Sequence, residues 1–326
     1  MSTFRYRLIE HRGTLLAAAV LATLLIVYIT NSHSGLNAAV ATNIANKGVL
    51  LAIVAMAQTL PILTAGLDLS VGMIFVLANC LASALVVGTP LETAFGIVVV
   101  LAVGLLCGLV NGLIIVYGRL QPIITTLATG AVYFGLALWL RPVPGGDVNA
   151  DLADAVTGQL PGGIPAMLAV LLAVVLLIWV PFRNSVIGRG AYAIGSSETA
   201  SYMSGIPIGR VKIVVYALAG LLASIAGILL TFVTYSGEAS ASIGGTYTLN
   251  SIASVVIGGT SLMGGFGSAI GSIFGAFVLR SIEDLLFVMD LDPLWQPLFQ
   301  GIVLLVAVSL GAFRLLRLSN RLKLFN

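Results

Sequence analysis

Long apolar runs separated by short polar turns constrain this chain more than any other feature. Two of the runs, 93–117 and 213–234, contain no charged residue, and at 1.5 Å per helical residue each is long enough to cross the hydrocarbon layer of a bilayer. Hydrophobic residues make up 59% of the chain and charged residues 8%, whereas soluble domains carry about 25% charged residues. The pattern excludes a water-soluble fold.

We expect an all-α, polytopic transmembrane bundle of about ten segments, within a range of roughly eight to ten. Residues 1–326 form one transmembrane domain in this interpretation. The segments 248–262, which is short and Gly-rich, and 268–288, which carries three charges, are candidates for re-entrant or broken helices. The predicted helices are 14–30, 44–65, 70–87, 91–117, 122–140, 164–182, 211–234, 248–262, 268–288 and 295–313.

The basic residues predict the orientation, because cytoplasmic loops are enriched in Lys and Arg. With both termini in the cytoplasm, twelve of the 15 basic residues fall on that side. The apolar stretch that begins at Thr14 lacks a small-residue cleavage site followed by a soluble domain, so we interpret it as a retained first span. The twelve residues are Arg5, Arg7, Arg12, Arg119, Arg183, Arg189, Arg210, Lys212, Arg314, Arg317, Arg321 and Lys323.

Two loops exceed the usual length of a connection between membrane helices. The outer loop, 141–163, is acidic and shows little periodicity, which favours a short cap over the external mouth. The inner loop, 183–210, is the one sizeable cytoplasmic loop of the predicted layout. The net charge of +3 belongs to such loops and forms no continuous basic face, so nucleic acid is not an expected partner.

A polar turn at 64–72 joins two apolar runs and carries a carboxylate. An ionisable group near membrane depth suggests function, but Gly66 is also suited to a left-handed helix end, and Asp68 or Ser70 to an N-cap. We favour the capping role over a substrate contact. In either role, the turn that ends at Gly72 is tight and fixed.

The second half of the chain contains a similar Gly-rich turn. The spacing of Gly66 and Gly72 equals that of Gly265 and Gly271, which hints at an internal repeat of the kind found in many transporters. Close helix packing in lipid favours small residues independently. Packing therefore remains the better explanation for any single glycine.

The inner loop contains a short predicted helix. From Ser196 or Ser197 to Met203 the sequence has a Ser cap, an acidic first turn at Glu198 and a glycine stop at Gly205. Its apolar side chains suit a groove on another subunit. The alternative, a helix resting on the bilayer surface, would favour a basic face that this helix lacks.

In three of its segments the chain resembles the ribose-type sugar permeases of bacterial ABC importers. These segments are 65–72, 188–206 and 258–265, and the likeness extends from about Asn37 to Phe313. The family commonly has Asn where this chain has Ser197, and a second Ala where it has Ser201; this departure leaves the choice of partner open.

The resemblance implies a multi-pass permease of the bacterial inner membrane that works as a dimer with a second copy or a paralogue. It further implies a separate ATPase subunit, which binds ATP and Mg²⁺, and a periplasmic sugar-binding protein. Residues 183–210 are then the coupling loop that the ATPase receives. The expected coupling residues are Gly195, Ser197, Glu198, Ala200, Ser204 and Gly205.

The sequence lacks the phosphate-binding motif of P-loop ATPases and any cluster of metal-ligand spacing. We therefore expect no catalytic residue, metal or cofactor in this chain. One alternative is an ion-coupled secondary transporter built around Asp68 or the group Arg280, Glu283 and Asp284, for which we favour internal pairing at i, i+3 and i+4. Another is an ABC permease for an amino acid or nucleoside.

Polar side chains within the predicted spans are candidates for the substrate path, because such residues face the interior of a bundle. Interhelical hydrogen bonding explains most of them without a substrate. The sequence predicts a small sugar, a pentose or hexose, through the resemblance alone. The candidates are Asn46, Gln58, Asn79, Asn111, Thr125, Thr126 and Asn250.

Overall fold

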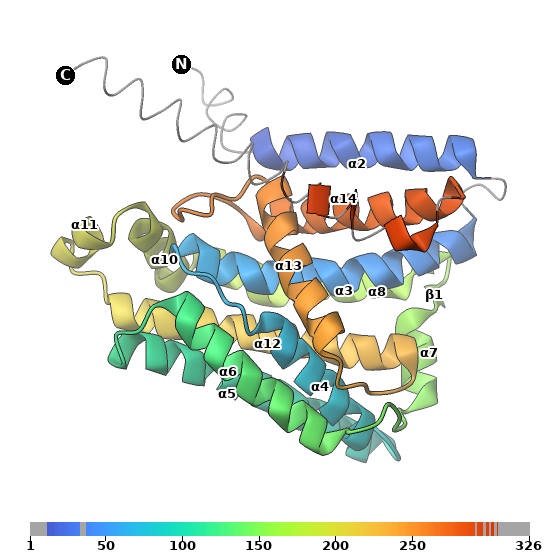
Figure 1. Ribbon diagram of the computed structural model, residues 1–326, viewed down its shortest axis with the longest axis horizontal. Helices are drawn as coiled ribbons and strands as arrows, with labels where there is room; N and C mark the ends of the chain where they lie inside the picture. Colours follow the sequence, from blue (N-terminus) through green and yellow to red (C-terminus); the bar gives the residue numbers. More distant parts are fainter. Residues whose placement is uncertain are drawn as a thin grey trace.

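The computed structural model describes residues 12–32, 37–290, 292–295, 298–299, 301–302 and 305. This part of the chain is helical apart from one two-stranded antiparallel hairpin, as Figure 1 shows. The elements are α2 (Arg12–Asn31), α3 (Ala38–Leu63), α4 (Val71–Leu85), α5 (Pro90–Tyr117), α6 (Pro122–Leu140), α7 (Ala150–Thr157), β1 (Gln159–Leu160), β2 (Ile164–Pro165), α8 (Ala166–Val174), η1 (Val175–Trp179), α9 (Val180–Asn184), α10 (Val186–Ser196), α11 (Glu198–Met203), α12 (Ile208–Thr234), α13 (Ala241–Ile257), α14 (Ala269–Val288) and η2 (Pro293–Trp295).

The all-α, multi-pass prediction is confirmed in its coarse form. Within the described ranges, six helices are long and apolar enough to cross a membrane: 13–31, 38–63, 90–117, 122–140, 166–184 and 208–234. Three more predicted segments correspond to α4, α13 and α14, of which α4 has 15 residues and α13 has 17. Most of the segment predicted at 295–313, together with both chain ends, lies outside the described residues.

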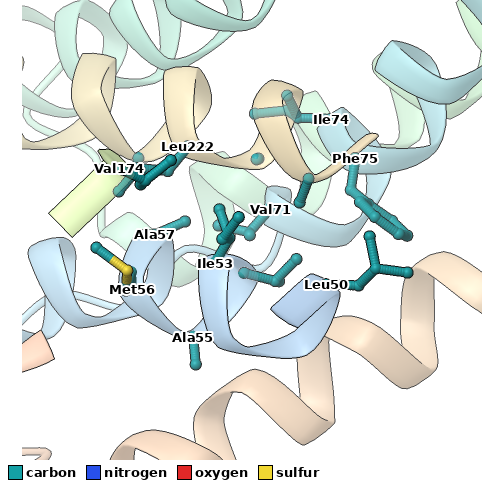
Figure 2. Packing of buried hydrophobic residues seen from close by; sticks show 14 of the residues in the cluster. Leu50, Ile53, Ala55, Met56, Ala57, Val71, Ile74, Phe75, Val174 and Leu222 are labelled. Atoms are coloured by element: carbon teal, nitrogen blue, oxygen red, sulfur yellow. The ribbon is translucent and has the colours of Figure 1, made fainter. Parts of the chain in front are cut away.

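Helix α3 forms the centre of the bundle. Its residues are buried without interruption from Gly48 to Leu63, as expected for a helix that is apolar on all sides. It packs against α12, α13 and α14. Figure 2 shows Leu50, Ile53 and Met56 of this helix among the side chains of α4, α8 and α12.

Helices α5 and α12 form another extensive helix pair. Small residues let their backbones approach: a Cβ atom at Gly108 would lie 2.1 Å from the Tyr216 carbonyl oxygen, and one at Gly220 would lie 2.2 Å from that of Gly104. Contacts of this kind drive helix association in lipid, where hydrophobic burial contributes little. Packing therefore accounts for these glycines.

Of the two segments suspected of being re-entrant or broken, 268–288 forms the continuous helix α14 from Ala269, whereas the helix of the other, α13, ends at Ile257 and leaves 258–262 in the following turn. The segment predicted at 248–262 begins earlier, at Ala241, where the Ser240 hydroxyl caps it by accepting from the Ile243 amide at 3.3 Å. Helix α14 runs through its charged stretch because Arg280 pairs with Glu283 and, at 3.6 Å, with Asp284. The i, i+3 and i+4 pairing expected from the sequence is confirmed.

The outer loop, 141–163, has more structure than its sequence indicates. It contains α7 and begins the β1–β2 hairpin. Gly145 and Gly237 form a backbone bridge, and Arg141 donates to the Ser83 hydroxyl and carbonyl at 2.9 and 2.8 Å. Tyr235, at the end of α12, donates to Asp154 of α7, and this hydrogen bond raises the pKa of Tyr235. The loop is tied firmly to the helices below it.

Candidate functional site

Cationic side chains gather at one end of the bundle. Arg119, Glu198 and Lys212 line one cavity there, while Arg183 and Arg189 line another. The opposite end carries the acidic 141–163 loop. By the enrichment of basic residues in cytoplasmic loops, the end with α10 and α11 is the predicted cytoplasmic face, and this orientation stays a prediction.

Helix α11 forms at this end much as its sequence predicts. The Ser197 hydroxyl caps it by accepting from the Ala200 amide at 3.3 Å. Gly205 has a φ of +76°, and the amides of Gly205 and Ile206 return to the carbonyls of Tyr202 and Ser201 at 3.0 and 3.1 Å. This pair of hydrogen bonds is the Schellman arrangement that ends many helices.

The outer face of α11 presents large, exposed side chains. Tyr202 is 75% exposed and Met203 is 81% exposed. Lys212 of α12 donates to both carboxylate oxygens of Glu198, at 2.8 and 2.9 Å. The helix is therefore held to α12 on one side while its aromatic and thioether groups face outward.

Helix α10 was missing from the sequence prediction, which treated 183–195 as loop. Gly188, Gly190 and Gly195 lower its helix propensity, so composition argues against a helix. The signal that identifies it is Ser185, whose hydroxyl accepts from the Gly188 amide at 2.9 Å. The predicted coupling loop, 183–210, thus contains the two helices α10 and α11 rather than one helix in a loop.

Gly195, near the end of α10, lies in a tight backbone contact of the site. A Cβ atom there would fall 2.0 Å from the Leu63 carbonyl oxygen and 2.3 Å from the Gly265 amide nitrogen. The Gly265 amide in turn donates to the Leu63 carbonyl at 3.1 Å. The end of α3, directly before the 64–72 turn, and the 258–268 turn therefore meet beside Gly195.

The prediction that Gly66 adopts the left-handed conformation is wrong, because Ala65 occupies it with a φ of +58°. The amides of Ala65 and Gly66 donate to the carbonyls of Ile62 and Pro61, which places Ala65 at the left-handed position of a Schellman motif. Gly66 has a different role: a Cβ atom there would lie 2.5 Å from the Tyr216 hydroxyl.

The same motif ends α13. Gly259 has a φ of +85°, and the amides of Gly259 and Thr260 donate to the carbonyls of Val256 and Val255. The two helix ends therefore match at Ala65 and Gly259, five residues away from the register that the spacing of Gly66 and Gly265 suggests. The spacing of the glycines therefore does not show which residues at the ends of α3 and α13 correspond.

Asp68 caps its turn in a way that differs in detail from the prediction. Ser70 is the residue before α4 but makes no side-chain cap. Instead, one Asp68 carboxylate oxygen accepts from the Ser70 amide at 2.9 Å and from the Ser70 hydroxyl at 2.6 Å. Gly72 then lets α4 approach α13, because its Cβ would lie 1.9 Å from the Gly244 carbonyl oxygen.

A buried chain of hydrogen bonds extends from this turn to α5 and α6. Asn111 donates to the Ser70 hydroxyl at 2.8 Å. The Tyr133 hydroxyl lies 3.0 Å from the Asn111 side-chain oxygen and 2.9 Å from the Cys107 carbonyl, so its single proton serves one acceptor at a time. The Leu69 amide donates to Thr126 at 2.9 Å.

The remaining path candidates have different environments. Asn79 donates to Thr231 and Ser236 and accepts from the Glu238 amide, so its amide group is engaged within the protein. Gln58 and Thr125 are buried, and their side-chain polar atoms have no partner among the residues that the structure describes. Asn46 donates to the Thr157 carbonyl, and Asn250 is half-buried on α13. Of the path candidates, only Asn111 and Thr126 belong to the Asp68 cluster, which is the hydrogen-bonded group formed with the 64–72 turn by Asp68, Ser70, Asn111, Thr126 and Tyr133.

Sequence reasoning overlooked two tyrosines of this site, Tyr133 and Tyr216. Both are buried, and the Tyr216 hydroxyl has no partner among the described residues. A hydroxyl within an apolar span is the signal that identifies such positions, since burial of an unpaired polar group is costly.

With six helices in its described part that are long and apolar enough to cross a bilayer, the bundle defines a multi-pass membrane protein. The model of the family described as branched-chain amino acid transport system / permease component matches residues 40–308. The chain belongs to this family.

Individual relatives are sugar importers by name. The ribose import permease protein of Haemophilus influenzae is 35% identical over 270 residues, which are 82% of this chain and 83% of the relative. That of Bacillus subtilis is 36% identical, with 82% and 83% covered. The fructose import permease protein of Rhizobium meliloti is 32% identical, with 82% and 76% covered. No solved structure gives a significant match.

Proposed function

We propose that this chain is the membrane-spanning subunit of an ATP-driven importer and that it carries a small sugar. The single observation that supports this most strongly is the docking of the 195–205 segment. It contacts the end of α3 at Leu63 and the 258–268 turn through Gly195, contacts α12 through Glu198, and leaves Tyr202 and Met203 outside. An apolar, outward-facing short helix fits the groove of a second subunit.

The contacts around Gly195 give the segment a mechanical role. A force on α11 reaches α10, and from there both the end of α3 at Leu63 and the turn before α14 at Gly265. In our proposal, closure of a partner ATPase displaces α11 and moves these two helix ends together. Packed interfaces of this kind transmit discrete rearrangements because they do not deform continuously.

The sugar itself is the more specific part of the proposal. The relatives named above are ribose and fructose permeases, and another relative, from Yersinia pseudotuberculosis, is an autoinducer 2 import permease at 32% identity. We propose a pentose or hexose, delivered from the outer face by a binding protein, in an inner membrane and through a dimeric core.

Co-purification of the tagged chain from its native membrane in mild detergent tests the proposal. We expect an ATPase subunit to be retained, and to be lost when Glu198 and Ser204 are replaced by residues of opposite charge or larger volume. Uptake of labelled ribose and fructose in vesicles identifies the substrate. ATP-independent uptake under an ion gradient, with no ATPase recovered, would contradict the proposal.

A further inference from the structure

A cavity of about 310 Å³ lies beside α11, where the connection between α5 and α6 meets the start of α12. Figure 1 shows this connection at the same end of the bundle as α11. Glu198, the first residue of α11, lines the cavity, so the cavity and the helix share a wall. Most of the remaining lining is apolar: Ile115, Val116, Leu120, Pro122 and Ile208.

Three charged side chains also line this cavity, and only two of them offset each other. Lys212 donates to both carboxylate oxygens of Glu198, at 2.8 and 2.9 Å. The third, Arg119, has no ion pair or side-chain hydrogen bond within the part of the chain that the structure describes. The cavity therefore presents one uncompensated positive charge beside an apolar wall.

The backbone at Arg119 has a conformation that arginine rarely adopts. Its φ is +53°, in the left-handed region that favours glycine. Gly118, directly before it, has the right-handed values φ −73° and ψ −13°. Among the described residues, the amides of Arg119 and Leu120 donate to no acceptor, and successive amides in a right-handed then left-handed pair attract anions. The connection therefore offers backbone donors, as well as a guanidinium group, to a carboxylate.

The cavity is continuous with the exposed surface of α11, and this indicates what covers it. Glu198 belongs to both, and Tyr202 and Met203 of the same short helix are 75% and 81% exposed. A protein that packs on these two side chains therefore extends over the cavity. The single positive charge is complementary to one carboxylate, and the aliphatic wall is complementary to an apolar side chain next to it.

We propose that this cavity receives a carboxylate side chain and an adjacent apolar side chain of the ATPase subunit, as a second contact beside α11. This contact rests on the proposed function, which supplies the partner. Arg119 pairs with the carboxylate through charge-assisted hydrogen bonds, and the apolar wall excludes water from the pair. Two separate contacts, at the cavity and at Tyr202 with Met203, fix the orientation of the partner, which one helix of six residues leaves free.

Co-purification of the tagged full chain with its ATPase subunit, identified by peptides that contain its phosphate-binding loop, tests the proposal. The variant is Arg119→Glu, with Arg210→Glu as the matched control, because Arg210 is exposed near the same end and lines neither of the two cavities. We expect Arg119→Glu to bind the ATPase about tenfold more weakly, as for loss of a charged hydrogen bond, and the control to change little. Arg119→Gly should also weaken binding without lowering the unfolding midpoint, because glycine adopts the left-handed conformation without strain.

A photoreactive benzoylphenylalanine in place of Leu120, which lines the cavity, identifies the occupant in native membranes. The same group in place of Ile124, which is 60% exposed and lines neither cavity, is the control. A cross-link to the ATPase from position 120 alone supports the second contact. Cross-linking to phospholipid alone, or equal ATPase binding by Arg119→Glu and Arg210→Glu, overturns it, although ATPase recovery with the unaltered chain would still support the importer. If the unaltered chain recovers no ATPase, the proposed function fails and the second contact with it.

Discussion

Lys212 of α12 donates hydrogen bonds to both carboxylate oxygens of Glu198 in α11, at 2.8 and 2.9 Å. Fourteen residues separate the two positions in the sequence. The pair is the one salt bridge that joins α11 to the transmembrane helices within the described part of the chain. It therefore fixes how the exposed helix is presented to a partner.

Charge reversal at this pair should impair transport with little effect on the fold. Glu198 is 56% exposed, and exposed pairs contribute about 1 kcal/mol or less to stability. We expect Glu198→Lys and Lys212→Glu each to lower ATP-driven uptake and to leave the thermal unfolding midpoint nearly unchanged. The double exchange should restore part of the uptake, because it rebuilds the pair with opposite polarity. A double variant no better than the single variants would show that Glu198 acts on the partner directly.

Gly195→Ala should be strongly destabilising. Its Cβ would lie 2.0 Å from the Leu63 carbonyl oxygen, a rigid backbone atom, and overpacking of this kind costs about 1–3 kcal/mol. The matched control is Gly245→Ala on α13, where no atom lies within 4 Å of the added Cβ and the higher helix propensity of Ala is favourable. Thermal unfolding in detergent compares the two. Equal midpoints would contradict the close packing of α10 against the end of α3 and the 258–268 turn.

The sequence was sufficient to predict most helices but not the contacts between turns. Apolar runs such as 122–140 are long, and periodicity and length determine them locally. Helix α10 was missed because its glycines lower the helix propensity, while tertiary packing against Val211 and Ile206 favours Gly190. Local propensity is a weak guide where burial decides the outcome.

The Asp68 cluster also shows that the sequence does not predict contacts between helices. The sequence indicates that Asp68 and Ser70 belong to a capped turn, because both residue types are common caps. It does not indicate that Asn111 and Tyr133, from two other helices, complete the cluster, since these contacts span 22 to 41 positions. Helix rotation about the bundle axis sets such contacts, and an apolar run with little amphipathicity contains almost no information about rotation.

Asp68→Asn should preserve both fold and transport. The Asp68 oxygen that accepts from Ser70 is retained in the amide, while the charge is removed and the second oxygen, which has no partner among the described residues, becomes an NH2 group. Asp68→Ala loses both hydrogen bonds, and we expect it to lower the free energy of unfolding by about 1–3 kcal/mol. Uptake and thermal unfolding of both variants are the measurements. A folded Asp68→Asn protein without transport would favour an ion-coupled carrier.

The two buried tyrosines should respond oppositely to removal of the hydroxyl group. Tyr216→Phe removes an oxygen that has no partner among the described residues, so stability should be unchanged or increased. Tyr133→Phe removes a donor that lies 3.0 Å from the Asn111 oxygen, and the unpaired acceptor should cost about 1–2 kcal/mol. Thermal unfolding of the two variants provides the comparison. A loss of stability in Tyr216→Phe would show that its hydroxyl has a partner in the assembled transporter.

Gln58→Leu should raise the stability of the protein and lower its transport. Gln58 is fully buried on α3, and neither of its amide atoms has a partner within the described residues; burial of such a group costs about 1–3 kcal/mol by mutational data. Replacement by Leu removes that cost, so we expect a higher unfolding midpoint. If Gln58 contacts the sugar as it crosses, uptake falls in the same variant.

Asn79→Leu is the matched control, because Asn79 is equally buried but hydrogen-bonded to Thr231, Ser236 and Glu238. Its loss leaves several buried groups unpaired, and we expect a lower midpoint by an amount that corresponds to about 2 kcal/mol or more. Vesicle uptake and thermal unfolding are measured for both variants. A Gln58→Leu protein that is stabilised and still transports at the normal rate would remove Gln58 from the path, while one as unstable as Asn79→Leu would assign Gln58 a structural hydrogen bond. The combination of higher stability and lower uptake is expected only where a buried polar group is retained for the substrate.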